Sequence, residues 1–293
     1  MTTEDVNSNL VKLVECPRDA MQGWTAFIPT EKKIAYLNAL LQVGFDSLDF
    51  GSFVSHKAIP QMADTKEVIK NLIPGKSKTR LLAIVANTRG AEDAALYPAV
   101  SDIGFPLSIS ETFQQRNANS TIAKSMETIS AIQEICYLSS KRLVVYLSMA
   151  FGNPYGDKWS PEIALNQIGR LADMGVPVIS LADTVGLAMP AQVHSLTKSL
   201  IDEFPAVEAG VHLHSRQEKS VEKIEAAYLA GCRRFDGAIN GIGGCPMAGD
   251  QLVGNMNSLL LIDYFRKKNA LPGVDDAVLR KSCTLADEIF SNH

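Results

Sequence analysis

The regular alternation of short apolar segments with longer amphipathic segments is the feature that most limits the folds open to this chain. Segments with the composition of strands occupy residues 12–15, 47–50, 80–86, 105–109, 142–147, 176–181, 210–214 and 234–239. Segments with helical periodicity follow them at residues 30–43, 61–72, 89–99, 119–139, 161–174, 190–204, 220–230 and 251–268. Strict alternation of this kind predicts a parallel sheet, because neighbouring parallel strands need a crossover connection, usually a helix.

Eight strand–helix units favour closure into a (β/α)8 TIM barrel over an open doubly wound sheet. The glycine-rich fingerprint of dinucleotide-binding open sheets is absent after the first strand-like segment, which supports the same choice. No linker or change of composition divides the chain. We therefore expect a single TIM-barrel catalytic domain over residues 1–293, with residues 274–293 as a C-terminal helical extension whose extra helix covers residues 276–290.

Composition excludes several classes of function. The net charge is −4 and no long basic run occurs, so neither nucleic acid nor a membrane surface is an expected partner. A transmembrane helix is not expected, since no stretch reaches about 18 apolar residues, and the polar N-terminus does not resemble a signal peptide. The five cysteines are widely spaced and lack a Cys-x-x-Cys pair, which indicates free thiols in a reducing compartment. We expect a cytoplasmic protein.

Two of the five histidines, His212 and His214, stand together at the end of the strand-like segment 210–214. Residues i and i+2 of a strand point to the same face, so both imidazoles can face one ion. An isolated pair of this type also occurs as surface or hydrogen-bonded core histidines. Here oxygen-bearing residues follow other strands, and a set of oxygen ligands with two imidazoles favours a divalent metal ion.

In α/β barrels the functional residues lie on the loops that follow the C-terminal ends of the strands. Polar residues occupy these positions along the chain: Arg18 and Asp19 after the first strand, Ser52 after the second, Asp183 after the sixth, and Cys245 and Asn255 after the eighth. Residues that are distant in sequence are therefore predicted to share one rim of the barrel.

Six short motifs in a fixed order give the chain a family resemblance. They are Pro17-Arg18-Asp19-Ala20-Met21-Gln22; Ser52-Phe53-Val54-Ser55 with Pro60-Gln61-Met62-Ala63-Asp64; Ser110-Glu111 with Phe113 and Asn117; Leu181-Ala182-Asp183-Thr184-Val185-Gly186; His212-Leu213-His214; and Gly241-Ile242-Gly243-Gly244-Cys245-Pro246. Over residues 11–255 the chain resembles the 3-hydroxy-3-methylglutaryl-CoA (HMG-CoA) lyases, which belong to a wider barrel family of metal-dependent carbon–carbon lyases and Claisen condensing enzymes. The resemblance implies an acyl-CoA substrate, a divalent cation (Mg²⁺ or Mn²⁺) and a homodimer.

The same resemblance implies a metal site made of Asp19, His212, His214 and Asn255. Two nitrogens and two oxygens suit Mg²⁺ or Mn²⁺ better than a structural zinc site. An asparagine after a glycine is also a common turn residue, so Asn255 has this second interpretation.

Four residues are implied to be catalytic: Arg18 as a fixed cation for a developing enolate, Cys245 in proton transfer, Asp183 with its neighbours as the base, and Asp49 as an acidic group on the second strand. Three more, Gln22, Ser52 and Ser180, are implied to bind substrate or to support the metal ligands. From the residues alone, Asp183 could equally cap the following helix and Ser180 could bond to backbone.

The implied reaction is a retro-Claisen cleavage of HMG-CoA to acetyl-CoA and acetoacetate, a step of leucine degradation and ketone-body formation. Two alternatives remain open from the sequence: a Claisen synthase that joins acetyl-CoA to a 2-oxo acid, and a metal-binding barrel without catalysis. The Gly-Gly-Cys-Pro motif favours the lyase. The chain departs from the family pattern at three places: Ser215-Arg216-Gln217-Glu218 after the histidine pair, Leu259 in place of a glutamate, and Gly23-Trp24-Thr25 near the N-terminus. The first two are the support for a barrel without catalysis. All three bear on the identity of the substrate and on the rate.

Overall fold

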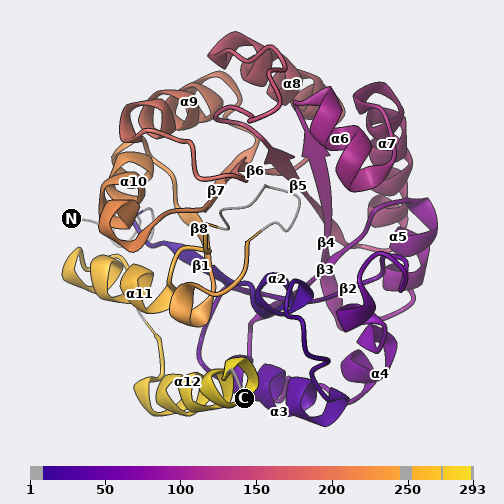
Figure 1. Cartoon of the computed structure of the whole chain (residues 1–293), viewed down its shortest axis with the longest axis vertical. Helices are drawn as coiled ribbons and strands as arrows, with labels where there is room; N and C mark the ends of the chain where they lie inside the picture. The colour runs from indigo at the N-terminus through magenta and orange to yellow at the C-terminus, as the bar shows by residue number, and fades with distance from the viewer. Residues whose placement is uncertain (1–8, 245–252, 272, 292–293) are drawn as a thin grey trace.

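The computed structural model describes residues 9–244, 253–271 and 273–291, and Cys245 therefore lies outside the described residues. Eight parallel strands form a closed barrel in sequence order, and β8 pairs with β1. They are β1 (Lys12–Glu15), β2 (Ser47–Ser52), β3 (Arg80–Ile84), β4 (Val100–Ser108), β5 (Arg142–Ser148), β6 (Val178–Asp183), β7 (Glu208–Leu213) and β8 (Arg234–Gly237). Figure 1 shows the barrel surrounded by its helices. The predicted TIM barrel is confirmed.

The helices form the outer layer of the barrel, except for α2 (Pro17–Gln22), which lies at the C-terminal end of the strands (Figure 1). They are α2 (Pro17–Gln22), α3 (Thr30–Leu40), α4 (Thr65–Lys70), α5 (Thr88–Ala95), α6 (Glu111–Ala118), α7 (Ile122–Leu138), α8 (Pro161–Asp173), α9 (Pro190–Glu203), α10 (Gln217–Leu229), α11 (Ser258–Lys267) and α12 (Asp276–Phe290), with short 3₁₀ turns η1 (Pro60–Met62) and η2 (Ile239–Gly241). The expected extra C-terminal helix is α12, which packs against α3 (Figure 1). Among the described residues, no helix has both the length and the apolar character needed to cross a membrane.

The segment after β4 differs from its predicted form. The helix predicted over residues 119–139 is confirmed as α7, but α6 is an additional helix between β4 and α7 that the pattern does not predict. Asn119 ends α6 in a left-handed conformation, with φ of 48°, and the Thr121 side chain caps α7 by accepting from the Lys124 N–H. Short polar caps, which carry no hydrophobic period, therefore determine where these helices begin and end.

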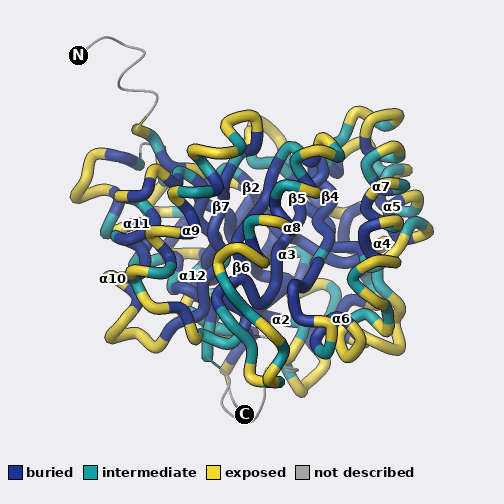
Figure 2. The backbone as a smooth tube through the Cα atoms, turned by 90° about the horizontal axis from the view of Figure 1, so that it is seen from above, coloured by how far each residue is buried: buried dark blue, intermediate teal, exposed yellow. Residues whose placement is uncertain are grey.

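Most of the apolar core lies between the strands and the surrounding helices, and Figure 2 shows buried strands inside an exposed outer surface. A smaller apolar cluster fills the middle of the barrel: Val14, Cys16, Leu82, Ile84, Val144, Tyr146 and Val178. Below this cluster, at the N-terminal ends of the strands, charged side chains replace apolar ones. Asp102 accepts from Arg80 and from Arg142, while Glu208 accepts from Lys12 and from Arg142. This ion network closes the N-terminal end of the barrel.

Glu15 points the other way from β1, toward the helices, and is completely buried. One carboxylate oxygen accepts from the Ile239 N–H at 2.8 Å, and the other accepts from the Ser258 hydroxyl. Burial raises the pKa of Glu15 to about 8, although both hydrogen bonds oppose the shift.

The raised pKa of Glu15 predicts a loss of stability between acidic and mildly alkaline pH. Above the pKa that Glu15 has in the unfolded chain, Glu15 is ionised in the unfolded state but keeps its proton in the folded state. The free energy of unfolding therefore falls as the pH rises toward 8. Glu15→Gln keeps one side-chain oxygen as a hydrogen-bond acceptor and cannot ionise. The free energy of unfolding of this variant should therefore depend less on pH. Urea unfolding between pH 5 and pH 8 measures this, with exposed Glu134→Gln as control. Parallel curves for wild type and Glu15→Gln would contradict the prediction.

Candidate active site

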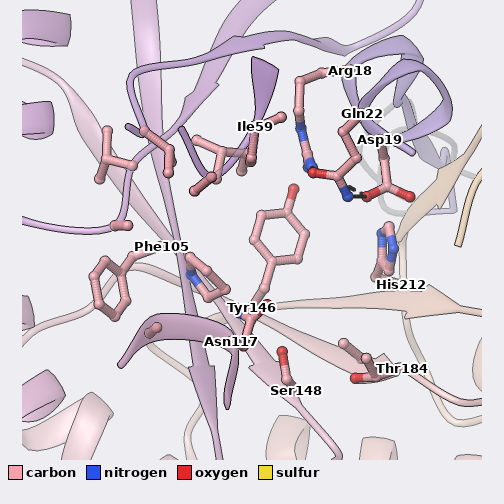
Figure 3. A pocket seen from close by; sticks show the side chains of 18 of the residues that line it. Arg18, Asp19, Gln22, Ile59, Phe105, Asn117, Tyr146, Ser148, Thr184 and His212 are labelled. Carbon is pink, nitrogen blue, oxygen red and sulfur yellow. Dashed lines mark hydrogen bonds and ion pairs between the residues drawn. The ribbon is translucent and has the colours of Figure 1, made fainter. Parts of the chain in front are cut away.

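A cavity of about 400 Å³ opens at the C-terminal ends of the strands. Its polar side is formed by Arg18, Asp19, Gln22, Asp49, His212 and His214, and its opposite wall by residues that include Phe105 and Asn117. Figure 3 shows Tyr146 in the middle of the cavity, with Asp19 and His212 facing one another. The structure therefore brings together six of the site residues that the sequence predicts.

The short helix α2 presents three of these residues from consecutive turns. Pro17 occupies the first turn of α2 directly after β1, which starts the helix with a residue suited to that position. Residues three and four apart share a helix face. Accordingly Arg18 Nη1 donates to Gln22 Oε1 at 2.8 Å, and Gln22 Nε2 donates to Asp19 Oδ1 at 2.8 Å.

Asp49 on β2 holds the guanidinium of Arg18 from the other side. Arg18 donates from Nε to Asp49 Oδ2 at 3.0 Å and from Nη2 to the same oxygen at 2.5 Å. Together with the two Nη1 contacts to Asp19 and Gln22, these bonds use four of the five N–H groups of Arg18. Among the residues that the structure describes, none accepts from the second N–H of Nη2, which can therefore donate to a ligand. A guanidinium fixed at four points is a preorganised binding group for negative charge.

The two carboxylates beside Arg18 differ in their pKa. Burial raises the pKa of Asp49 to about 6, even though Arg18 lowers it. Burial would also raise the pKa of Asp19, but Arg18 and the two histidines lower it to about 2. Asp19 is therefore an anion at neutral pH, whereas Asp49 can gain or lose a proton near neutral pH.

Both histidine rings are oriented by their Nδ1 atoms. His212 Nδ1 lies 3.1 Å from Asp236 Oδ2, and His214 Nδ1 lies 3.0 Å from the Val253 carbonyl oxygen. With Nδ1–H donating to these oxygens, each Nε2 carries the lone pair, and the two Nε2 atoms lie 3.2 Å apart. Burial and the neighbouring His212 lower the pKa of His214 to about 4, so its imidazole is neutral.

These donors fit a divalent cation. The ligand atoms of Asp19, His212 and His214 all lie within 4.8 Å of one another. One carboxylate oxygen and two imidazole nitrogens suit Mn²⁺ and related ions and leave positions for a substrate. Asn255 lies beside this group. Its backbone forms an isolated β-bridge with His214, and its Nδ2 donates to Asp19 Oδ2 at 2.8 Å. Its role as a fourth ligand stays a prediction.

Asp183 is the last residue of β6 and is not among the cavity-lining residues that the structure describes. Its carboxylate accepts from Lys223 Nζ at 2.7 Å and from the Ala188 N–H at 3.1 Å. Lys223 also donates to the His214 carbonyl oxygen at 3.0 Å. These contacts connect β6 to α10 and to the histidine pair, which is the arrangement of a positioning group. The sequence-based role of Asp183 as base stays a prediction.

Neither of the two predicted serines is among the described lining residues of the cavity. Ser52 Oγ accepts from the Val54 N–H at 3.3 Å. Ser180 is completely buried, and its Oγ has no hydrogen-bond partner among the described residues. Gln22, in contrast, contacts both Arg18 and Asp19.

Several residues at the site escape the sequence-based interpretation: Arg116, Tyr146, Ser148 and Thr184 in the cavity wall, and Lys223 and Asp236 behind the rim. Tyr146 and Ser148 are separated by one apolar residue near the end of β5. This spacing places both side chains on one face of the strand, and it could have predicted that both face the barrel interior. Asp236 is buried on the short strand β8, where a carboxylate needs a specific partner.

Fold and site define an α/β barrel with a carboxylate and two imidazoles gathered at its C-terminal rim. Comparison with known proteins gives the family. Residues 11–275 match the HMGL-like family, and the chain belongs to it.

The relatives found by sequence and by structure agree with this assignment. The hydroxymethylglutaryl-CoA lyase YngG of Bacillus subtilis is 32% identical over 236 residues, which cover 79% of this chain and 77% of the relative. The (R)-citramalyl-CoA lyase of Chloroflexus aurantiacus is 31% identical over 272 residues, covering 90% of this chain and 85% of the relative. An HMG-CoA lyase from Acinetobacter baumannii, solved with coenzyme A and 3-methylmalate, superposes with a TM-score of 0.89 at 29% identity, covering 99% of this chain and 93% of that one.

Because Lys223 and Asp183 form a buried ion pair, we expect removal of the Lys223 charge to lower the stability of the protein strongly. Lys223→Met leaves a buried carboxylate without a counter-charge, which should lower the free energy of unfolding by about 3–5 kcal/mol. Exposed Lys219→Met on the same helix should change it by less than about 0.5 kcal/mol. Chemical denaturation measures both variants. Equal stabilities for the two would show that the pair does not hold the rim.

Proposed function

We propose that this protein cleaves HMG-CoA to acetyl-CoA and acetoacetate in a divalent-metal-assisted retro-Claisen reaction. The observation that carries the proposal is the placement of Arg18, fixed at four of its five N–H groups, beside the Asp19–His212–His214 group in one cavity. Membership of the HMGL-like family and relatives named as HMG-CoA lyases support it. Because these relatives are named as lyases, we favour cleavage over the condensing direction.

Asp19, His212 and His214, with Asn255 beside them, are the residues that would hold Mg²⁺ or Mn²⁺. When bound, such a cation acts as a Lewis acid and lowers the pKa of a coordinated hydroxyl. The protein supplies the ionised carboxylate of Asp19 and two imidazoles whose Nδ1 atoms are already engaged by Asp236 and the Val253 carbonyl.

Arg18 serves the other end of the breaking bond. As the C2–C3 bond of the substrate breaks, its electron pair moves onto the thioester and negative charge develops on the thioester oxygen. The free N–H of Arg18 Nη2 can donate to that oxygen, while Asp49 and Gln22 keep the guanidinium from turning away. Donors that are held in place before the reaction stabilise such charge at little reorganisation cost.

Two proton transfers complete the reaction. The substrate hydroxyl loses a proton to a base, for which the sequence indicates Asp183 or a group acting with it. We assign the acceptor to Asp49, which lines the cavity with a pKa raised by burial to about 6, and we assign to Asp183 and Lys223 the positioning of the rim. The thiol of Cys245 then gives its proton to the acetyl-CoA carbanion, and the proton on Asp49 restores the thiol.

A second substrate has specific support. The (R)-citramalyl-CoA lyase matches more of this chain than YngG does, 90% against 79%. Citramalyl-CoA and HMG-CoA both carry a tertiary hydroxyl and a carboxylate on a thioester, so the same site groups serve both.

We also propose a cytoplasmic homodimer that acts in leucine degradation and ketone-body formation; a relative from Rattus norvegicus is named as cytoplasmic.

Activity is tested with purified protein, Mg²⁺ and HMG-CoA or citramalyl-CoA, by following acetyl-CoA together with the oxo acid. Arg18→Gln should lower kcat/KM by about 100-fold or more, because it removes a fixed cation from the developing enolate. Exposed Arg89→Gln should retain the wild-type value. Failure to release acetyl-CoA from either ester would refute the lyase, and rapid release of free CoA from acetyl-CoA with a 2-oxo acid would favour the synthase.

Metal binding is tested independently of turnover by calorimetric titration with Mn²⁺. His212→Ala removes one of two facing imidazoles and should weaken binding by at least about tenfold. Exposed His194→Ala on α9 is the matched control and should bind as wild type does. An unchanged affinity in His212→Ala would mean that the histidine pair is not a metal site.

A further inference from the structure

Arg234 on β8 is a completely buried cation within the barrel. Its Nε, Nη1 and Nη2 atoms have no hydrogen-bond partner among the residues that the structure describes. An uncompensated charge in such a place is strongly destabilising. The compensation must therefore come from nearby carboxylates acting through their charge.

The chain makes room for Arg234 on the neighbouring strand. Gly210 of β7 pairs in register with Arg234, and a Cβ at Gly210 would lie 3.0 Å from Arg234 Cδ. A side chain at this position would have to displace the arginine. The glycine therefore accommodates a long charged side chain where an α/β barrel usually has branched apolar residues.

The ion network at the N-terminal end of the barrel does not balance Arg234 by itself. Arg234 Nη1 lies 3.6 Å from Asp46 Oδ2 and 3.9 Å from Glu208 Oε1. Those two carboxylates and Asp102 face four cations: Lys12, Arg80, Arg142 and Arg234. By this count one positive charge has no carboxylate of its own in the network, and Arg234 is completely buried whereas Lys12 and Arg80 are partly exposed to solvent.

Asp236 is the buried carboxylate on the same strand that can act on Arg234 through its charge, although it makes neither a hydrogen bond nor an ion pair of 4.0 Å or less with Arg234. It stands two residues after Arg234 on the same strand, so both side chains point into the barrel. Burial lowers the pKa of Arg234, but nearby carboxylates raise it overall, and Asp236 contributes most among them. Asp236 Oδ1 has no hydrogen-bond partner among the described residues, while Oδ2 lies 3.1 Å from His212 Nδ1.

We propose that Arg234 is a positioning residue for the metal site: it provides the counter-charge of Asp236, and Asp236 orients His212 so that Nε2 faces Asp19 and His214. This inference rests on the proposed metal site. It connects the ion network at one end of the barrel to the rim at the other through two side chains of a single strand.

The test is Mn²⁺ affinity measured by calorimetry. Arg234→Met should weaken Mn²⁺ binding by about tenfold, the loss typical of removing support behind a metal ligand. Arg234→Lys keeps the charge and should recover most of that loss. Arg80→Met removes another cation of the same ion network, one that bonds to Asp102, and should leave Mn²⁺ affinity unchanged.

A double-mutant cycle shows whether Arg234 acts through Asp236. Asp236→Asn should weaken Mn²⁺ binding, and adding Arg234→Met to it should cause no further loss. Full additivity, or unchanged affinity in Arg234→Met beside a loss in Asp236→Asn, would overturn the inference. If Asp236→Asn and His212→Ala both bind Mn²⁺ as wild type does, the metal site itself is refuted, which is a different result.

Thermal stability and NMR give two further readouts of the charge pairing. Each single substitution leaves one buried charge unpaired, so the double variant Asp236→Asn/Arg234→Met should melt at a higher temperature than the less stable single variant. A double variant that melts below both singles would overturn the charge pairing. In metal-free protein, the ¹⁵N shifts of His212 should indicate Nδ1–H in wild type and a tautomer mixture in Arg234→Met; identical shifts would contradict the inference.

Discussion

The pairing of β8 with β1 is the constraint on which the site depends. It closes the barrel with Val14 opposite Asp236, residues that the sequence separates by most of the chain. Closure places α2, which begins immediately after β1, beside the end of β7. Only then can Asp19 approach His212 and His214, because no local contact joins these segments. An open sheet made of the same strands would leave the carboxylate and the imidazoles at opposite edges.

Two buried cations bond to carboxylates of the rim, and each of them holds a different helix against the barrel. Arg18 bonds to Asp49 and fixes α2 against β2. Lys223 bonds to Asp183 and fixes α10 against β6. Charges removed from water at such cost persist when they are paired with good geometry. The rim is therefore positioned by directional bonds as well as by apolar packing, and this gives the cavity a defined set of donor orientations.

Periodicity in the sequence predicts the features of this fold that repeat in space. The eight strands, the facing histidines at i and i+2, and the use of strand ends as a rim are all of this kind. Periodicity fails where a single side chain decides the outcome. The short helix α6, which ends where Asn119 adopts positive φ, is missed. Lys223 lies on an amphipathic helix and resembles a solvated lysine in the sequence, although it is buried against Asp183. Partners of buried charges come from distant segments, so the sequence offers no spacing that reveals them.

The charged interior of this barrel links its two ends. In many α/β barrels the N-terminal end serves stability and the C-terminal end serves chemistry, separated by layers of apolar side chains. Here an apolar cluster fills part of the interior, but β8 carries Arg234 and Asp236 past it to His212. Electrostatic interactions between buried groups are weakly screened, so under the proposed pairing the loss of the buried charge of Arg234 is felt by the histidine at the rim. Stability and site geometry are therefore coupled through one strand.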